Sequence, residues 1–232
     1  MKQIITLIAL AALWAGMKAE SLTSYDLKIG DFTELRVSDG INVDYRHDDA
    51  RAGKAQFRCP SQMASAFMFT NKGGKLTVQL SPESIGTKGL PTIQVFSRYL
   101  TKVENTADST VRVLTVKDCP KLEAKLEGNG RLVVHHVDAN EVKGSMRLGH
   151  GTLVMSGKCR DAKFDLTGTG VIQADDLEAE NVQVNAKGTG SVGVCAEKAL
   201  NVYGIGSTSV YYIGSPEIKN RSMGIKLSPL SK

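Results

Sequence analysis

The stretch that decides the fold runs from Leu122 to Ile213, and one copy of its repeat reads Leu166-Thr167-Gly168-Thr169-Gly170-Val171-Ile172. Each copy is a run of alternating residues, then Gly-x-Gly, then a second alternating run. The first glycines of successive copies are spaced by 21, 19, 20 and 16 along the chain. A period near 20 with strand-like flanks is typical of a β-solenoid, in which each repeat forms one coil. The predicted corner glycines are Gly128/Gly130, Gly149/Gly151, Gly168/Gly170, Gly188/Gly190 and Gly204/Gly206.

Apolar residues recur at fixed distances from each corner. Successive side chains of a strand point to opposite faces, so these positions predict one shared interior. Stacked coils should therefore place Leu132, Leu153, Ile172 and Val192 in a single interior column. Antiparallel hairpins that turn at Gly-x-Gly are the alternative, but they would not need the same inward positions in every copy. The other recurring positions are Leu126, Leu166, Ala186, Val202, Val134, Met155, Ala174, Val194, Thr208 and Val210.

Glycine suits these corners for a steric reason. A sharp turn with φ > 0 is cheap only without a Cβ, and neighbouring coils lie only about 4.8 Å apart. The second copy departs from the pattern, because Arg147 occupies a position that is apolar elsewhere. We expect a one-residue bulge there, with Met146 and Leu148 facing inward.

Residues 1–19 have the features of an export signal. Lys2 provides a positive start, residues 4–15 form a short apolar core, and Ala19 ends a candidate cleavage site. An apolar run this short is typical of a secretory signal rather than of a membrane span. The mature chain is expected in the periplasm, at the outer cell surface or outside the cell. Its net charge falls from +5 to +3 without Lys2 and Lys18, which is too small to indicate a nucleic-acid partner.

The rest of the chain divides into an N-terminal β region, residues 20–119, and a continuous solenoid with a C-terminal cap, residues 120–232. Less regular strands are predicted at 33–37, 40–45, 55–59, 75–80 and 92–97. A degenerate copy of the repeat is centred on Ala107, which precedes Gly128 by one period. The predicted fold is all-β: an irregular N-terminal β layer that leads into a parallel β-helix, or β-solenoid, of five or six coils.

The tripeptide Gly40-Ile41-Asn42 precedes these coils, and the stretch from Val210 to Pro216 follows them. Together they resemble the auto-transporter adhesin head GIN domain, a bacterial secreted family, from about Phe32 to the C-terminus. The resemblance implies an all-β fold with β-helix character and a cell-envelope or surface location. The family's commoner Ser-Gly-x-Gly-Asp corner is altered here, because Thr167 and Val171 flank one of the glycine pairs. This departure removes the residues on which a ligand role of the corner would depend.

Two signals for ligand chemistry have simpler explanations. The segment from Gly188 to Gly193 matches a dinucleotide fingerprint, but that mechanism needs a helix after the glycines, and strand residues follow here. A zinc site needs three or four converging ligands, and the histidines do not supply such a set. The sequence therefore predicts no cofactor and no metal site, and the histidines concerned are His47, His135, His136 and His150.

The four cysteines are Cys59, Cys119, Cys159 and Cys195. The last three lie nine residues before the first glycine of a corner, so two of them in coils two apart would be about 9.6 Å apart. That separation is beyond disulfide reach. Cys59 with Cys119 is the one candidate disulfide, and the solenoid cysteines are expected to be small buried residues.

Carboxylates form no recognisable catalytic pair. Asp165 is expected to stack between Met146 and Asn185 of the neighbouring coils, so acids do not continue from coil to coil. A glycoside hydrolase needs a general acid and a base or nucleophile close together. No catalytic residues are predicted.

Three tyrosines near the end of the solenoid, Tyr203, Tyr211 and Tyr212, are candidate ligand-binding residues. Tyr211 and Tyr212 face opposite ways on a strand, so one of them should be outward. An exposed tyrosine on a flat sheet can stack on a sugar or on a partner surface. The alternative is that Tyr212 and the tail, residues 215–232, cover the open edge of the last coil.

These observations favour a secreted, non-enzymatic, adhesin-like binding module. Its partner would be a surface glycan, or an envelope or host protein, and neither nucleic acid nor a membrane span is expected. Two other hypotheses remain: a carbohydrate-active β-helix enzyme, and a structural envelope protein that self-associates into an oligomer.

Overall fold

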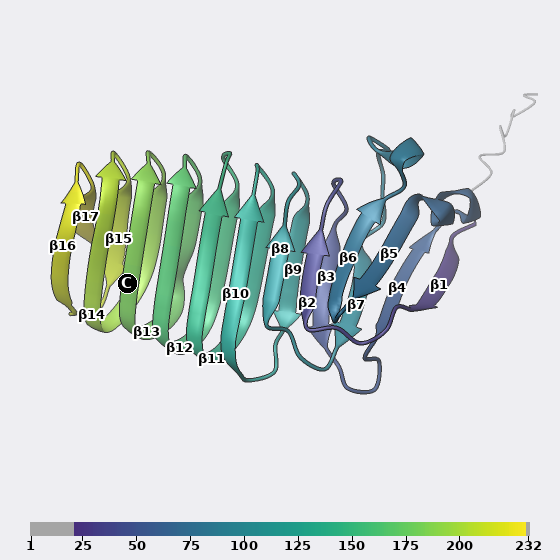
Figure 1. The fold of residues 1–232 in the computed structure, drawn as a ribbon, viewed down its shortest axis with the longest axis horizontal. Helices are drawn as coiled ribbons and strands as arrows, with labels where there is room; N and C mark the ends of the chain where they lie inside the picture. The colour runs from purple at the N-terminus through teal and green to yellow at the C-terminus, as the bar shows by residue number, and fades with distance from the viewer. Residues whose placement is uncertain (1–20, 231–232) are drawn as a thin grey trace, which may run out of the picture.

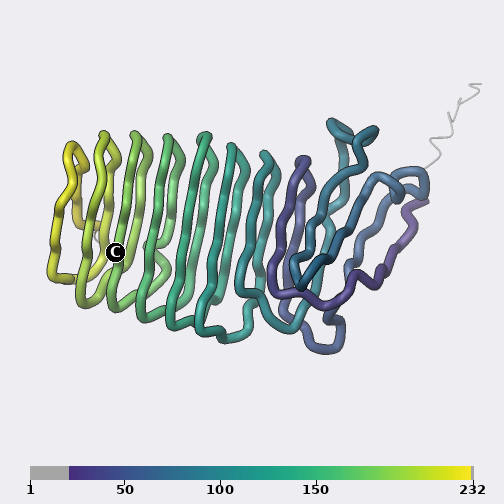
Figure 2. Tube along the Cα trace, in the orientation of Figure 1, coloured from purple at the N-terminus to yellow at the C-terminus, as the bar shows by residue number. Residues whose placement is uncertain are grey.

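The computed structural model describes residues 21–230, which form an almost all-β molecule. The strands lie across a long stack, with β1 and β4 near one end and β16 at the other (Figures 1 and 2). This arrangement confirms the predicted β-solenoid of about 20-residue coils, of which there are about six. The predicted export signal, residues 1–19, lies outside the described residues. In the described part, no helix is long and apolar enough to span a bilayer.

The elements follow one another along the chain as strands with two short 3-10 helices, η1 and η2. The N-terminal elements are β1 (Thr23–Lys28), β2 (Glu34–Val37), β3 (Val43–His47), β4 (Lys54–Cys59), η1 (Ser61–Ala66), β5 (Phe67–Lys72), β6 (Lys75–Leu80), η2 (Pro82–Ser84), β7 (Ile93–Ser97), β8 (Lys102–Asn105) and β9 (Thr110–Thr115). The coil strands are β10 (Cys119–Glu127), β11 (Arg131–Arg147), β12 (Thr152–Gly168), β13 (Val171–Gly188), β14 (Ser191–Gly206), β15 (Ser209–Ile213), β16 (Glu217–Met223) and β17 (Lys226–Pro229).

Successive coils pair in parallel, and each long strand of the solenoid continues from one side of the stack around to the other (Figure 1). The predicted interior column is present, and each of its side chains is fully buried. Antiparallel hairpins at the glycine corners are therefore wrong. The members of the column, each opposite the next, are Leu132, Leu153, Ile172, Val192 and Val210.

The Gly-x-Gly corners align along one edge of the stack, the upper edge in Figure 1. Gly149, the first glycine of its pair, has a φ of +115°, a conformation that side chains rarely adopt. A Cβ on Gly149 would also lie 2.6 Å from the carbonyl carbon of Gly128 in the preceding coil. Backbone conformation and the close approach of the next coil thus both require glycine at this position.

The backbone conformation of the second glycine in most pairs differs from the expectation. The positive φ predicted for the corners is wrong for Gly130, Gly151, Gly170 and Gly190, whose φ lies outside the left-handed region. A Cβ on Gly151 would nevertheless lie 2.6 Å from the carbonyl oxygen of Gly130. A Cβ on Gly130 or on Gly190 would likewise collide with a carbonyl oxygen, that of Ala107 or of Gly170. At these second positions only the closeness of the preceding coil requires glycine.

The second copy does contain one extra residue, but the predicted strand bulge is wrong. Met146 is buried opposite Leu166, as expected. Leu148, however, is 73% exposed and has a φ of +57°. The strand stays in register through Arg147, opposite Thr167, so the extra residue is placed in the corner. A corner has no interior side, and the Leu148 side chain therefore lies in solvent.

The N-terminal region contains coil-like layers that are stacked out of sequence order. β2 pairs in parallel with β6 on one side and with β8 on the other. β3 pairs in the same way with β7 and with β9. The layer of β2 and β3 therefore lies between a layer of β6 and β7 and a layer of β8 and β9. The last of these is the predicted degenerate copy, because its Val111 lies opposite Leu132.

Antiparallel strands close the N-terminal end of the stack. β5 pairs with β6, and β4 pairs with both β7 and β1. An aromatic cluster packs inside this end, where the ring of Phe57 lies 5.2 Å from Tyr25 and 5.1 Å from Phe67 between centroids. This mixed sheet is the predicted irregular N-terminal β layer.

The C-terminal tail forms one further coil. β16 pairs with β14, and β17 pairs with β15. One of its inward positions becomes polar: Asn220 lies opposite the buried Val202, and its Oδ1 accepts hydrogen bonds from the N–H and hydroxyl of Ser222. Lys219 and Arg221 stand on the edge strand β16, where charged side chains oppose pairing with another chain.

Candidate binding surfaces

Each corner divides a coil into a strand before the glycines and a strand after them, so the stack has two broad faces. We call the first the pre-corner face; it comprises β6, β2, β8, β10, the parts of β11–β14 that precede a corner, and β16. The second is the post-corner face; it comprises β7, β3, β9, the parts of β11–β14 that follow a corner, β15 and β17.

Near the N-terminal end of the pre-corner face, outward charges pair within a strand and across layers. The Glu104 carboxylate is almost fully buried and lies 3.0 Å from Lys102 Nζ and 3.2 Å from Lys75 Nζ. Burial acts to raise the pKa of Glu104, but the hydrogen bonds from the two lysines outweigh it, so the pKa lies below its usual value. Lys143 Nζ likewise lies 3.3 Å from Glu123. These charges satisfy one another and hold the layers together.

Farther along the same face, the charge pairs give way to carboxylate–amide pairs. Asp161 Oδ1 accepts a hydrogen bond of 2.9 Å from Asn181 Nδ2, and Asp165 Oδ1 accepts one of 2.6 Å from Asn185 Nδ2. Gln183 Nε2 in turn donates to Asn185 Oδ1 at 3.0 Å. We call these five residues the amide ladder. Asp and Asn recur in it at an offset of 20 residues, a sequence signal that a search for paired acids alone misses.

Of the two neighbours predicted for Asp165, one is confirmed and the other is wrong. Asn185 lies opposite it, as expected. Its other neighbour is Ser145 rather than Met146, because the extra residue of the second copy sits in the corner and does not shift the strand.

Two shallow hollows border the amide ladder. One, of about 410 Å³, is lined by Arg147, Asp165, Asn185, Lys187 and Tyr203, among others. The other, of about 270 Å³, includes Arg160, Asp161, Lys163, Asn181, Gln183 and Asn201. The amide ladder thus presents hydrogen-bonding groups to two adjoining hollows.

The structure does not bring the three candidate tyrosines together. Tyr203 lies on the pre-corner face opposite Asn185 and lines the larger of the two hollows. Tyr211 is 38% exposed on the post-corner face, opposite Gly193. Tyr212 faces inward and packs, partly buried, against the hydrophobic core near the last coil.

The Gly40-Ile41-Asn42 motif forms the corner between β2 and β3. Gly40 has a φ of +81°, and Ile41 is fully buried. Asn42 connects three layers, because its carbonyl oxygen accepts the N–H of Ile93 at 2.9 Å and its Oδ1 accepts the N–H of Thr110 at 2.8 Å. The motif therefore joins the layers that are stacked out of sequence order.

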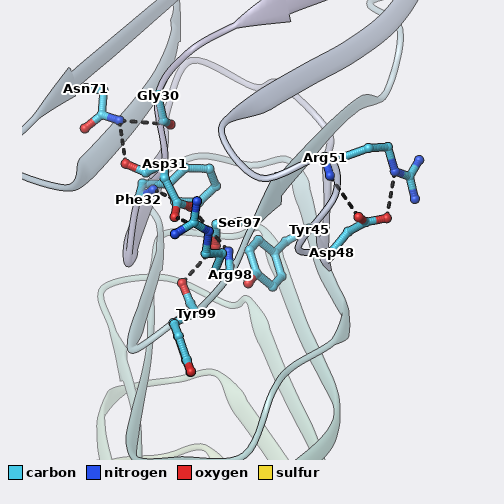
Figure 3. Close-up of polar contacts among 10 residues, drawn as sticks. All are labelled: Gly30, Asp31, Phe32, Tyr45, Asp48, Arg51, Asn71, Ser97, Arg98 and Tyr99. Atoms are coloured by element: carbon cyan, nitrogen blue, oxygen red, sulfur yellow. Dashed lines mark hydrogen bonds and ion pairs between the residues drawn. The ribbon is translucent and has the colours of Figure 1, made fainter.

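A polar cluster fixes the chain where it enters this region (Figure 3). Asn71 Nδ2 lies 3.0–3.1 Å from the carbonyl oxygens of residues 29–31. The Asp31 carboxylate accepts the N–H of Phe32 at 3.1 Å and the N–H of Arg98 at 3.3 Å. These contacts hold the segment between β1 and β2 against β5 and the end of β7.

The buried end of the cluster is centred on Tyr45, whose hydroxyl lies 2.9 Å from Ser97 Oγ (Figure 3). Ser97 donates its own hydrogen to the Tyr99 carbonyl at 2.8 Å, so Tyr45 is the donor to Ser97. Burial raises the pKa of Tyr45 to about 12. Because these groups bond to one another, the cluster has a structural role.

In the described part of the chain, the residues considered for metal, redox or nucleotide chemistry do not form such a site. Within residues 21–230, no group of three or more His, Cys, Asp and Glu side chains could hold a metal ion. Cys59 and Cys119 are not joined, so the candidate disulfide is not formed, and Cys159 and Cys195 are buried thiols outside any disulfide. Burial raises the pKa of the Cys159 thiol to about 12. The glycines at 188–193 lead into the strand β14 rather than into a helix.

Solved structures with the same fold come from Bacteroides and Parabacteroides. A "putative adhesin" from Bacteroides fragilis NCTC 9343 has a TM-score of 0.82 at 19% identity, over 91% of this chain and 97% of that one. A "putative adhesin" from Parabacteroides distasonis ATCC 8503 has a TM-score of 0.76 at 16% identity, over 91% and 98%. A "putative lipid binding protein" from the same strain has a TM-score of 0.70 at 18% identity, over 92% and 98%. At these identities the likeness shows the fold alone, and no curated protein matches the chain.

A family model described as "Putative auto-transporter adhesin, head GIN domain" matches residues 31–216. The matched region contains the Gly40-Ile41-Asn42 corner and all five Gly-x-Gly corners. It covers most of the chain, and it agrees with the resemblance seen in the sequence. The chain therefore belongs to the auto-transporter adhesin head GIN domain family.

Proposed function

We propose that this protein is an exported, adhesin-like binding module that holds a glycan on its pre-corner face. The observation that supports the proposal is the amide ladder beside Tyr203. Hydrogen bonds within the ladder fix Asp165, Asn185 and Gln183 on rigid strands, so their remaining donors and acceptors are already oriented for sugar hydroxyls. Tyr203, in the adjoining hollow, supplies a ring on which a sugar can stack.

Export and surface location are part of this proposal. Residues 1–19 have the pattern of a secretory signal. The family description and two of the related structures carry the word adhesin. A glycan fits the amide ladder better than a protein partner does, because the side chains of the ladder are polar, whereas the buried core of a protein interface is more apolar than the surrounding surface.

Catalysis is not part of the proposal. Asp161 and Asp165 stand four residues apart on one strand, which places them about 13 Å apart. Glycosidases hold their two carboxyl groups roughly 5–9.5 Å apart. Hydrogen bonds from Arg160 and then from Asn181 also lower the pKa of Asp161, whereas a general acid needs a raised pKa.

Glycan-array binding by the purified protein tests the proposal. Tyr203→Ala and Asn185→Ala should each weaken binding to any glycan that the unmodified protein retains, by about tenfold for the loss of a stacked ring or of a well-placed amide. Tyr211→Ala is the matched control, because it removes an exposed tyrosine from the opposite face. It should leave binding within twofold.

Three outcomes would contradict the proposal. An unchanged affinity in Tyr203→Ala and Asn185→Ala would exclude the amide ladder as the site. A loss in Tyr211→Ala alone would move the site to the post-corner face. Rapid release of reducing ends from a bound polysaccharide would favour the carbohydrate-active enzyme instead.

A further inference from the structure

A second concave surface lies at the N-terminal end of the stack, apart from the amide ladder. It is a hollow of about 620 Å³ formed by β1, β4 and β7, and its size is that of an ordinary small-ligand pocket. β4 pairs antiparallel with β1 on one side and with β7 on the other, so outward side chains of three strands stand side by side. The strands that carry the lining residues belong to the mixed sheet at the right of Figure 1. We call it the N-terminal trough.

Outward side chains form two rows across the trough. In the first row Asp26 lies opposite Gln56, and Gln56 lies opposite Gln94. In the second row Ser24 lies opposite Arg58, and the β4–β7 register, continued by two residues, places Thr92 opposite Arg58. Neighbours across strands stand about 5 Å apart. The rows therefore present amide, hydroxyl and charged groups at intervals of about one sugar ring.

Fewer of the polar side chains in the trough form hydrogen bonds or ion pairs with one another than do those of the pre-corner face. Asp26 is already compensated, because Gln56 Nε2 and Lys54 Nζ lie 3.1 and 3.3 Å from its Oδ2. Arg58 is exposed, and its guanidinium makes no ion pair or hydrogen bond with the residues described, 21–230. The side-chain amide of Gln94 is equally unpaired within that range.

The first row continues beyond the trough onto the post-corner face. Asp44 lies opposite Gln94, and Arg112 lies opposite Asp44 with two contacts of 2.6 and 2.7 Å. The row thus crosses β1, β4, β7, β3 and β9, a path of roughly 19 Å at the usual spacing of strands. That length accommodates an oligosaccharide of a few units rather than a single sugar.

We propose that the N-terminal trough binds a short oligosaccharide that carries a carboxylate, such as a chain of uronic acids. The planar guanidinium of Arg58 matches a carboxylate in a bidentate arrangement. Gln94, Gln56 and the hydroxyl of Thr92 supply donors and acceptors for the sugar hydroxyls. Tyr25, Phe57 and Pro91 also line the hollow and supply apolar surface on which a sugar ring can pack. This site is independent of the amide ladder.

Isothermal titration of the purified protein with trigalacturonate and with neutral galactotriose tests the proposal. Trigalacturonate should bind at least tenfold more tightly than galactotriose. Arg58→Gln should weaken trigalacturonate binding about tenfold or more, because it removes a charge-assisted pair. Arg58→Lys should restore part of the affinity, because it keeps the charge without the planar fork. Arg131→Gln neutralises an exposed arginine that lies outside the trough, on the post-corner face, and should change the affinity for trigalacturonate less than twofold.

Several results would overturn this site. Equal affinity for the neutral sugar, or an unchanged affinity in Arg58→Gln with an unaltered circular dichroism spectrum, would do so. The site would also be overturned if none of the trimers of galacturonate, glucuronate and sialic acid bound at millimolar concentration. Binding of a carboxylate-bearing peptide alone would likewise overturn it. Tyr203→Ala should leave the titration unchanged. The trough and the amide ladder can therefore fail separately.

Discussion

Replacing Gly144 by alanine should destabilise the solenoid through a clash inside the core. Gly144 occupies an inward position of β11, directly opposite Phe164 of the next coil. A Cβ on Gly144 would lie 2.8 Å from Phe164 Cδ1 and 3.1 Å from Leu153 Cδ2. Both neighbours are buried, and neither is the free end of a long side chain. The added methyl group therefore forces the two coils apart locally.

The expected loss is about 1–2 kcal/mol. Overpacking a well-packed core costs about 1–3 kcal/mol. Alanine offsets part of this, about 0.4–1 kcal/mol, by restricting the unfolded chain, because Gly144 does not have a left-handed backbone conformation. With a urea dependence of about 2 kcal/mol per molar, the unfolding midpoint should fall by about 0.5–1 M.

Urea unfolding followed by circular dichroism measures this shift, and a double-mutant cycle identifies its cause. Phe164→Leu in the Gly144→Ala background should recover part of the loss, with a coupling energy of about 1 kcal/mol, because the smaller side chain makes room for the methyl group. Gly193→Ala is the control, since the atoms nearest its Cβ would belong to the side chain of Asp175, with Oδ1 at 3.0 Å. A raised midpoint for Gly144→Ala, or strict additivity with Phe164→Leu, would refute the proposed clash.

Three further predictions concern the N-terminal layers and the buried thiols. Asn42→Ala should cost about 1 kcal/mol in urea unfolding, because the Thr110 N–H loses its acceptor, whereas Asn42→Asp, which keeps an oxygen there, should cost less. Burial raises the Tyr45 pKa above its unfolded value of about 10, so the fold favours the neutral phenol; that stability is complete below pH 10 and is lost as the pH rises towards 12. Tyr45→Phe should therefore flatten the loss of stability between pH 10 and 12, and a pH-independent difference between the two proteins would argue against this. Cys159 should not react with a thiol reagent at pH 8 until urea unfolds the protein, because burial raises its pKa to about 12; fast labelling of the folded protein would contradict its burial.

The coils could be predicted from the sequence because their determinants are local and repeated. Glycine pairs with a period near 20, together with inward residues such as Leu132 and Ile172, specify both the corners and the interior column. The position of Leu148 could not be predicted, because alternation alone does not distinguish a bulge in a strand from an extra residue in a corner. That choice depends on whether the strand keeps its register with the next coil.

The N-terminal layers and the binding surfaces were harder to predict from the sequence. Residues 81–92 separate β6 from β7 without a Gly-x-Gly pair. The repeat pattern therefore does not show that β6 and β7 form a layer next to β2 and β3. The trough depends on antiparallel pairing of β1, β4 and β7, which brings together Ser24, Arg58 and Thr92 from distant positions. The amide ladder was accessible in principle, since Asp161 and Asn181 repeat at the coil period.

The nonsequential N-terminal stack also has a kinetic consequence. Each solenoid coil closes against a neighbour about 20 residues away, whereas Asn42 and Thr110 are 68 residues apart. Loop closure over the longer distance costs about 1 kcal/mol more entropy, and the layer of β2 and β3 is paired on both sides only once β8 and β9 have joined it. Folding therefore has no reason to begin at the N-terminus. A nucleus among β11–β13, extended one coil at a time in both directions, would leave the threefold junction around Asn42 as the last barrier to cross.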